Sequence, residues 1–466
     1  MKTPAKTFTL GQSPSYTPER VRCRTEGDIN TTPGRQNRQA RVDQGTREIL
    51  DQDARFFFHQ SLSTPCLDVV EGASGSFLNC RSAGRVLDFH GNNVHQVGHA
   101  HPHVTAAVKD QLDRLVFCPR RFTCRPAIEL ARELVRRSPI PQSKILLAPG
   151  GAEAMGMAMK IARHATGRYK TISFWDSFHG AALDTSSIGG ERLFRDGMHP
   201  LLPGCLHAPP PAVPPSHRET PSLEAMRDPD YLGYLMRKEG DIGAVIAEPF
   251  RYSFALDPPA DYWQRVRRLC DKHGALLVFD EIPVCLGRTG HWFACDRYQV
   301  VPDILVIGKG LGGGLFPLAA VLARSGLDTA RDLALGHYTH EKTPLGSAAA
   351  LAVLEVIETE GLLGKALDKG DHALAALERL RLKYPMIGSV SGIGLQLALE
   401  LVDRHGLPAG ETAEQVLYHC LSLGLSFKVA GGNILSLAPP LTIADEDLNR
   451  ALEILDLALG RECETR

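Results

Sequence analysis

The sequence lacks any pair of cysteines in a CxxC arrangement, although it contains 11 cysteines. Cysteines at that spacing are typical of zinc sites, and regular sets of cysteines are typical of disulfide frameworks in small secreted domains. Scattered cysteines fit neither use. We therefore expect no metal site, no disulfide framework and a reducing, cytoplasmic location.

An excess of charge of one sign is also missing, because 52 lysine and arginine residues face 53 aspartate and glutamate residues, for a formal net charge of −1. A chain without a basic excess is not expected to bind nucleic acid or an anionic membrane. No apolar run is long enough to span a bilayer. Residues 1–20 lack the apolar core of a secretion signal. Composition therefore suggests neither a nucleic acid nor a membrane as a partner.

The length of 466 residues, with 43% hydrophobic residues, allows two or three packed domains. Residues 1–45 are polar and show little periodicity, so we predict a flexible N-terminal arm there. The predicted divisions after it are the N-terminal part of a small domain (46–103), a large cofactor-binding domain (104–346) and the C-terminal part of the small domain (347–466). Residues 199–221 are rich in proline and are interpreted as a surface connector, with recognition of a proline-binding partner as the alternative.

Short apolar strands alternate with helical patterns through the middle of the chain. Such alternation predicts an α/β fold with a mostly parallel sheet covered on both faces. After residue 347 the pattern changes to long helices and two strands, which predicts a smaller α+β domain. The predicted strands are 144–148, 171–175, 244–247, 275–279, 304–307, 395–399 and 433–437, and the predicted helices include 104–115, 127–135, 154–163 and 262–273.

Two charged motifs stand directly after predicted strands. Asp280 and Glu281 follow the strand 275–279, and Lys309 follows the strand 304–307 within VIGKGLGGG. Ligand sites in open α/β sheets lie at the carboxyl ends of the strands. A carboxylate there could cap a helix, bind a metal or pair with a cation. A lysine there could be desolvated and activated as an amine nucleophile, or could bind phosphate, although the order GxxxxGK(S/T) is absent.

Two further motifs complete a possible ligand site. APGGAEA (148–154) is a glycine turn that opens a helix, where backbone N–H groups and the helix dipole favour an anion. SFHG (177–180) places Phe178 at the end of a strand, either as core packing or as a ring stacked on a flat cofactor. An anion cradle, a stacking ring, a carboxylate for a ring nitrogen and a Schiff-base lysine are together the groups that hold pyridoxal 5′-phosphate, which is the predicted cofactor.

From about residue 50 to the C-terminus, the chain resembles the class III aminotransferase family, of the ornithine and ω-amino acid type. The segments that carry the resemblance are VGHAHPHV, GGAEAMGMAMKIAR, SFHG, AVIAEPF, LLVFDEIPVCLGRTG, PDILVIGKGLGGG, HYTHEKTPLGSAAALAVLE and LAPPLTI. The resemblance implies the fold type I of enzymes dependent on pyridoxal phosphate. It also implies a homodimer with shared active sites.

The resemblance gives a role to each matched residue. Lys309 is the lysine that bonds to the cofactor and Asp280 is the partner of the pyridinium nitrogen, so these two are the predicted catalytic residues. The other predicted cofactor contacts are the amides of Gly151 and Ala152, the stacking ring of Phe178, the carboxylate of Glu248, the side chain of Ile282 on the other ring face, and Thr339, which reaches the cofactor phosphate of the neighbouring subunit.

Two positions depart from the family pattern. Pro283 stands where the family usually has a glutamine near the ring hydroxyl of the cofactor, and proline has no side-chain donor. In NILSLAPPL, Ser436 stands where the family usually has an arginine that binds the α-carboxylate of the substrate. Losing such a charge-assisted pair costs about 1.5–3 kcal/mol. The departure favours a lyase, which needs one substrate, over an aminotransferase, which needs two; a tolerated serine in a strand is the alternative.

Within the family, the segments DFHGNNVHQVGH, CPRRFT and GHYTHEKTP resemble ammonia-lyases that act on 1-hydroxy-2-aminoethylphosphonate. The resemblance implies a lyase of phosphonate catabolism that removes water and ammonia and yields phosphonoacetaldehyde. The competing functions are an ω-aminotransferase that uses a keto acid such as pyruvate, and a non-catalytic relative, against which Lys309 and Asp280 argue. The resemblance places four cations near the substrate together with Ser436, and ordinary surface charge is the alternative for at least two of them: Lys342, Arg120, Arg121 and Arg251.

Overall fold

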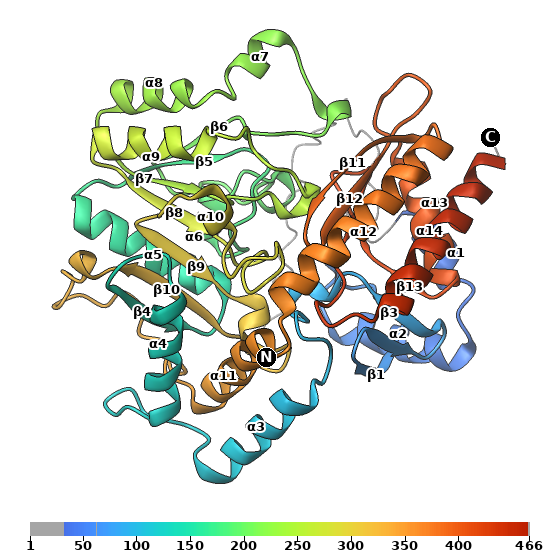
Figure 1. Cartoon of the computed structure of the whole chain (residues 1–466), viewed down its shortest axis with the longest axis horizontal. Coiled ribbons are helices and arrows are strands. Elements are labelled where there is room, and N and C mark those ends of the chain that lie inside the picture. The colour runs from blue at the N-terminus through green and yellow to red at the C-terminus, as the bar shows by residue number, and fades with distance from the viewer. Residues whose placement is uncertain (1–31, 62, 465–466) are drawn as a thin grey trace, which may run out of the picture.

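The computed structural model describes residues 32–61 and 63–464. A seven-stranded sheet lies at the centre of the larger part of the molecule (Figure 1), in the order β4-β10-β9-β8-β7-β5-β6. Strands β6, β5, β7, β8 and β9 are parallel, whereas β10 runs antiparallel to both β4 and β9. The strand bounds are β4 Ser143–Ala148, β5 Lys170–Phe174, β6 Cys205–Ala208, β7 Ile242–Ala247, β8 Leu276–Asp280, β9 Ile304–Ile307 and β10 Ala319–Arg324.

Both faces of this sheet are covered by helices. Strands β7, β8 and β9 are buried along their whole length, so alternate side chains enter two different cores. One core is completed by α5 (Gly151–Thr166). The other core includes Tyr262 and Trp263 of α9. Helix α9 spans Tyr262–His273, the bounds predicted from the sequence. The mostly parallel α/β fold predicted from the sequence is confirmed.

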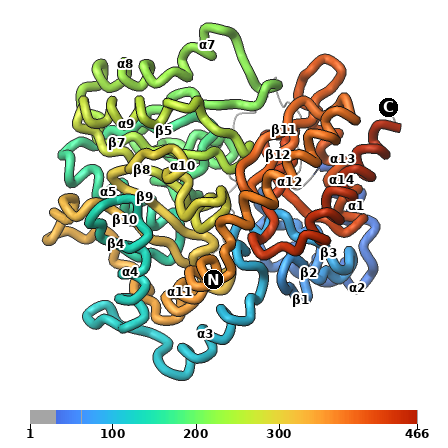
Figure 2. The backbone as a smooth tube through the Cα atoms, in the orientation of Figure 1, coloured from blue at the N-terminus to red at the C-terminus, as the bar shows by residue number. Residues whose placement is uncertain are grey.

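Two four-stranded sheets form the smaller part of the molecule. The first has the order β1-β2-β3-β13 and the second the order β11-β12-β15-β14. Because β13 pairs in parallel with β3, segments from near the two ends of the chain share one sheet, and Figure 2 shows these blue and red parts side by side. The strand bounds are β1 Val70–Ser74, β2 Phe77–Cys80, β3 Gly84–Asp88, β11 Ile387–Ile393, β12 Gln396–Leu401, β13 Leu425–Ser426, β14 Lys428–Ala430 and β15 Ile434–Leu437.

The other helices pack around these three sheets, and none of the described helices is long and apolar enough to cross a membrane. Their bounds are α1 Pro33–Gln39, α2 Gln44–Phe56, α3 Pro102–Arg114, α4 Arg125–Arg137, α6 Leu183–Ile188, α7 Pro221–Ala225, α8 Pro229–Glu239, α10 Ala294–Tyr298, α11 Pro344–Thr359, α12 Leu362–Lys383, α13 Gly410–Ser422 and α14 Asp445–Glu464.

Three local features differ from the sequence-based expectations. The end of the predicted arm includes α1, which Thr32 caps and whose Arg35 donates from Nη2 to the carbonyl of Pro65 over 3.0 Å; residues 1–31 lie outside the described part. The proline-rich segment 199–221 contains β6, because its residues 205–208 pair with β5. Strand β10 was not predicted, and its antiparallel direction depends on pairing that local periodicity does not encode.

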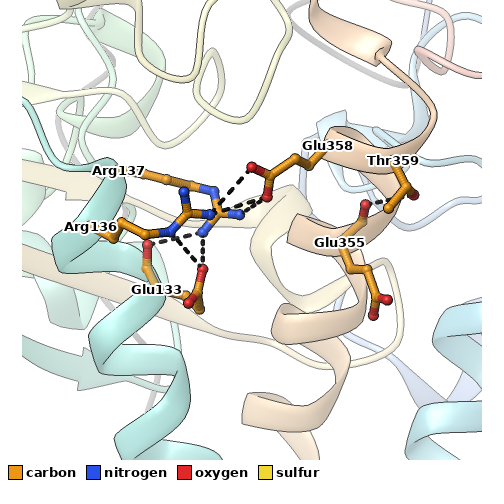
Figure 3. Close-up of polar contacts among 6 residues, drawn as sticks. All are labelled: Glu133, Arg136, Arg137, Glu355, Glu358 and Thr359. Atoms are coloured by element: carbon orange, nitrogen blue, oxygen red, sulfur yellow. Dashed lines mark hydrogen bonds and ion pairs between the residues drawn. The ribbon is translucent and has the colours of Figure 1, made fainter.

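Helix α11 contacts both α4 on the outside of the large part and the turn that follows β9. Arg136 of α4 contacts Glu358 of α11 at 3.1 Å, and Arg137 also pairs with Glu358 (Figure 3). The guanidinium of Arg137 lies 4.7 Å from the ring centre of Trp292. Helix α11 also packs on the turn that begins at Lys309. The contacts between α4 and α11 therefore help to hold in place the helix that packs on the turn Lys309–Gly312.

Candidate active site

A cavity of about 710 Å³ lies at the carboxyl ends of β8 and β9. This is the edge where the sequence predicts a ligand site. The cavity brings together residues from both the large and the small part of the chain. Its described polar and charged lining side chains are His90, Asn92, Glu153, His179, Glu191, Glu248, Tyr252, Ser253, Asp280, Lys309 and Lys428.

Lys309 follows β9 after one glycine, Gly308, and begins the next turn. Its φ of 47° lies in the left-handed region, a conformation that costs free energy in a residue with a side chain and persists where packing enforces it. Burial lowers the pKa of its amine, and the carboxylates of Asp280 and Glu248 partly offset this effect. The Nζ atom lies 5.9 Å from the ring centre of Tyr252. Lys309 is therefore a buried amine held at the cavity wall.

Asp280 ends β8 and is almost fully buried, with 2% of its surface exposed. Its Oδ2 lies 2.7 Å from Nδ1 of His179, and its Oδ1 accepts a hydrogen bond from the backbone N–H of Ile282 over 3.1 Å. The Nε2 atom of His179 is buried without a hydrogen-bond partner in the described chain. This pair can hold a negative charge at the cavity floor and present it to a cationic ring.

The predicted anion cradle lies at the start of α5. Gly150 caps this helix without a side chain and Gly151 is its first residue, so the first backbone N–H groups of the helix are free to face an anion. A Cβ atom on Gly151 would lie 2.9 Å from Cδ1 of Ile282. Glycine therefore keeps this part of the wall open, and the predicted residues Gly151, Ala152 and Ile282 all line the cavity.

Phe178 and Glu248 form another part of the wall. The backbone N–H of Phe178 donates to Oε1 of Glu248 over 3.2 Å. The Phe178 ring lies 4.5 Å from the ring of Phe194 and is 38% exposed. A half-exposed ring beside a cradle for an anion is suited to stacking on a flat ligand. Burial raises the pKa of Glu248, while His179 and Arg251 act in the opposite direction.

Pro283 and Tyr252 line the side of the cavity nearest the small part. The carbonyl oxygen of Pro283 accepts from Nδ2 of Asn93 over 3.1 Å. Burial raises the pKa of Tyr252 to about 12, with Ser436 and Asn93 acting against the shift through hydrogen bonds. The hydroxyl of Tyr252 is therefore protonated at neutral pH. The polar groups on this side come from His90, Asn92 and Tyr252, in a region where Pro283 itself offers no side-chain donor.

Three of the residues predicted to bind cofactor or substrate share a surface outside this cavity. Thr339 and Lys342 are exposed in the loop before α11, and Arg120 is half-buried in the loop before α4. The ring of Phe117 lies 5.2 Å from that of His340, so the two loops are neighbours. None of the three lines the cavity, and the contact of Thr339 with a neighbouring subunit stays a prediction.

Arg251 is buried beside the cavity rather than in its lining. Its Nη2 donates to the carbonyl of Asp176 over 2.9 Å. Its guanidinium lies 4.0 Å from the ring centre of Phe254. Burial lowers its pKa, although Asp176 and Glu248 raise it. Arg251 thus ties the loop after β5 to the segment 252–254, and a direct substrate contact of its side chain stays a prediction.

Ser436 is buried in β15, and its hydroxyl accepts from Nε2 of Gln396 over 3.3 Å. It lies behind Tyr252 and does not line the cavity. The serine is therefore an uncharged hydrogen-bonding residue beneath the cavity wall.

Sequence reasoning missed several residues that the structure places in the cavity. His179 stands inside the SFHG motif, where only the phenylalanine was given a role. His90 and Asn92 belong to DFHGNNVHQVGH, which was used for resemblance alone. Lys428 is the single charge in the apolar stretch LSFKVA, and that isolated charge was the available signal.

Comparison with known proteins places the chain in a family. The profile described as Aminotransferase class-III matches residues 59–459. The chain belongs to the class III aminotransferase family. It is 44% identical over 462 residues to the (R)-1-hydroxy-2-aminoethylphosphonate ammonia-lyase of Vibrio splendidus, covering 94% of this chain and 96% of that protein. It is 36% identical to the leucine/methionine racemase of Thermococcus litoralis, covering 89% of this chain and 95% of the other.

Solved structures of the family share the fold. The ω-transaminase of Pseudomonas jessenii in complex with PMP has a TM-score of 0.83 at 26% identity, with 89% of this chain and 98% of that chain covered. An amine transaminase from an uncultivated Pseudomonas species, solved with PLP bound, has a TM-score of 0.77 at 29% identity, with 87% and 98% covered. The predicted family and fold are confirmed.

The family and its PLP-bound structures imply pyridoxal phosphate as the cofactor, and the cavity residues fit that group. The open helix start at Gly151 suits its phosphate and the Phe178 ring suits stacking. Asp280, with its buried histidine partner, suits a protonated ring nitrogen. Lys309 suits a covalent bond to an aldehyde carbon.

Proposed function

We propose that this class III family member is an ammonia-lyase for 1-hydroxy-2-aminoethylphosphonate. The net reaction converts this amine into phosphonoacetaldehyde and ammonia, because the water lost in elimination is returned when the resulting enamine hydrolyses. The similarity to the Vibrio splendidus protein supports the substrate. The observation that carries the proposal is the neutral, hydrogen-bonded Ser436 at the position where an aminotransferase of this family is expected to have an arginine.

The missing guanidinium bears on the type of reaction. An aminotransferase binds a second substrate, usually a keto acid or an amino acid, and holds its carboxylate with a charge-assisted contact. No arginine is found among the described residues of the cavity lining. A lyase acts on one substrate and needs no keto acid. This difference supports elimination over transfer.

The cofactor, Lys309, Asp280 and His179 have different roles in the proposed reaction. Bound pyridoxal phosphate supplies an electron sink for the carbon that loses a proton. Lys309 takes that proton from the carbon that bears the amine, and its lowered pKa leaves more of the amine in the neutral, proton-accepting form near neutral pH. The proton can then leave with the β-hydroxyl as water. Asp280 holds the ring nitrogen protonated, and His179 holds Asp280 in place.

The proposed reaction is tested by assaying ammonia and aldehyde from 1-hydroxy-2-aminoethylphosphonate with the purified holoenzyme. We expect both products in equal amounts without any keto acid, and no gain in rate when pyruvate is added. 2-Aminoethylphosphonate, which has no hydroxyl to eliminate, is the control substrate and should give no ammonia. Activity that appears only with pyruvate would instead establish an ω-aminotransferase.

The proposal includes a cytoplasmic homodimer with shared sites. The surface that carries Thr339 also presents Val116 and Phe122, which are 54% and 66% exposed. Large exposed apolar side chains near a residue predicted to reach a neighbouring subunit favour a protein partner. Sedimentation velocity of the holoenzyme should give the mass of two chains, and a monomer at micromolar concentration would exclude a site completed by a partner subunit.

A further inference from the structure

The cavity has few permanent positive charges. Its described lining contains no arginine and only two lysines, Lys309 and Lys428; the pKa of Lys309 is lowered by burial, and this lysine is assigned to the cofactor. His90 also faces this space, but burial and the nearby Lys428 lower its pKa to about 4. A neutral histidine can donate a hydrogen bond but adds no charge. An anionic substrate group therefore has Lys428 as its available cation in the described lining.

The strand register places Lys428 on the substrate side of the cavity. Lys428 of β14 is the direct partner of Ser436 in β15. Directly opposed residues of antiparallel strands point to the same face, with Cβ atoms about 4.5–5.5 Å apart. Ser436 lies against Tyr252, whose ring lies 5.9 Å from Nζ of Lys309. Lys428 thus extends from the small part of the molecule into the cavity that also contains the amine of Lys309.

This position is separate from the cradle assigned to the cofactor phosphate. The cradle is the start of α5, which packs on the central sheet. Lys428 belongs to the sheet β11-β12-β15-β14, and its known charge neighbours are Lys309 and His90. The two anion-binding features therefore come from different sheets, and one anion does not need both.

The amine of Lys428 has no hydrogen bond or ion pair with any described side chain, although the residue is half-buried. The cavity lining also contains carboxylates, but the groups whose pKa Lys428 lowers are the bases Lys309 and His90, which cannot serve as its counterion. A partly buried ammonium group without a counterion is unfavourable, and an entering anion relieves that cost. Lysine also carries its charge on a flexible four-carbon stem that can follow a tetrahedral anion.

We propose that Lys428 binds the phosphonate of the substrate and selects dianionic amines for this site. The assignment rests on the proposed function. It identifies Lys428 as the residue that binds the anionic group of the substrate, which the uncharged Ser436 cannot do by charge. The family usually has an arginine at position 436 in β15; here the positive charge is instead on Lys428, the residue opposite it in β14. A phosphonate has three oxygens around phosphorus, and a point charge with three N–H donors suits it.

The test compares ligand binding by the wild-type holoenzyme and by the Lys428→Met holoenzyme. Binding is measured from the change in the visible absorbance of the cofactor. 2-Aminoethylphosphonate is the ligand with a charged phosphonate; its dimethyl ester, which keeps the amine but has a neutral phosphonate group, is the matched neutral ligand. The substitution should weaken binding of the charged ligand about 10- to 100-fold, the scale of a hydrogen bond to a charged group. Binding of the ester should change less than about threefold, and Lys428→Arg should restore most of the affinity for the charged ligand.

Lys272→Met is the matched control, because Lys272 is exposed near the end of α9, ahead of β8 and thus at the opposite edge of the sheet. It should bind both ligands as wild type does. Equal loss for the charged and neutral ligands in Lys428→Met, or loss of charge selectivity only in Lys342→Met, would overturn the proposal. The proposed reaction fails separately, if wild-type enzyme binds the phosphonate with charge selectivity but releases no ammonia without pyruvate.

Discussion

Replacing Lys309 with alanine is expected to abolish turnover and to remove the visible absorbance that comes from the cofactor bonded to its lysine. Loss of the proton-transferring group alone costs about 10²- to 10⁴-fold in rate, and the covalent attachment is lost as well. No other lysine of the described cavity lining comes from the end of β9, since Lys428 belongs to the sheet of the small part. Absorbance spectra and initial rates of ammonia release measure the two effects.

Lys272→Ala is the control for this substitution, because it removes an exposed lysine far from the cavity. Its spectrum and rate should match those of the wild type. A Lys309→Ala protein that keeps both the absorbance and the turnover would show that another amine attaches the cofactor. Added methylamine, which can replace a lost lysine amine in solution, should restore part of the rate if the fold is intact.

Replacing Asp280 with asparagine is expected to leave the cofactor bound but to lower the rate about 10²- to 10³-fold, the scale seen when one electrostatic contact to a developing charge is removed. The amide has nearly the shape of the carboxylate but cannot hold the ring nitrogen's proton by charge. The same change removes the anionic partner of His179, now 2.7 Å away. Rates at saturating substrate, with cofactor content measured in parallel, check the prediction.

Glu281→Gln supplies the matched control for Asp280→Asn. Glu281 is the next residue, is fully buried and accepts a hydrogen bond from the backbone N–H of Cys295 over 2.8 Å. Burial raises its pKa to about 7, so a neutral side chain is already accessible at this position. It does not line the cavity. A loss of rate in Glu281→Gln as large as in Asp280→Asn would point to general damage at the end of β8.

The order of strands, charges and glycines already predicts much of this site. A strand followed at once by Asp280, and another followed by Lys309, can be recognised without knowing which strands are neighbours. Parallel strands place their carboxyl ends at one edge, so the sequence predicts that both side chains meet a common ligand. The structure agrees, since β8 and β9 are adjacent and both residues line the cavity.

Other features depend on pairings between distant segments. The hydrogen bond of Asp280 to His179 joins residues 101 positions apart, and local patterns do not reveal it. The same holds for β6, whose apolar residues look like part of a proline-rich connector until they pair with β5. The contacts of Arg251 are also tertiary, because its charge reads as a surface feature but its side chain is buried against Phe254.

The sequence by itself determined the family and the absence of an arginine at position 436, and it predicted the cofactor chemistry, because each depends on which residue follows which along the chain. Only the tertiary structure decided what stands opposite Ser436. The register of β14 and β15 sets Lys428 directly across from it, and strand register is fixed by side-chain packing between segments rather than by the segments themselves. The charge that the sequence shows to be missing at one position is therefore found, in the folded chain, on the neighbouring strand.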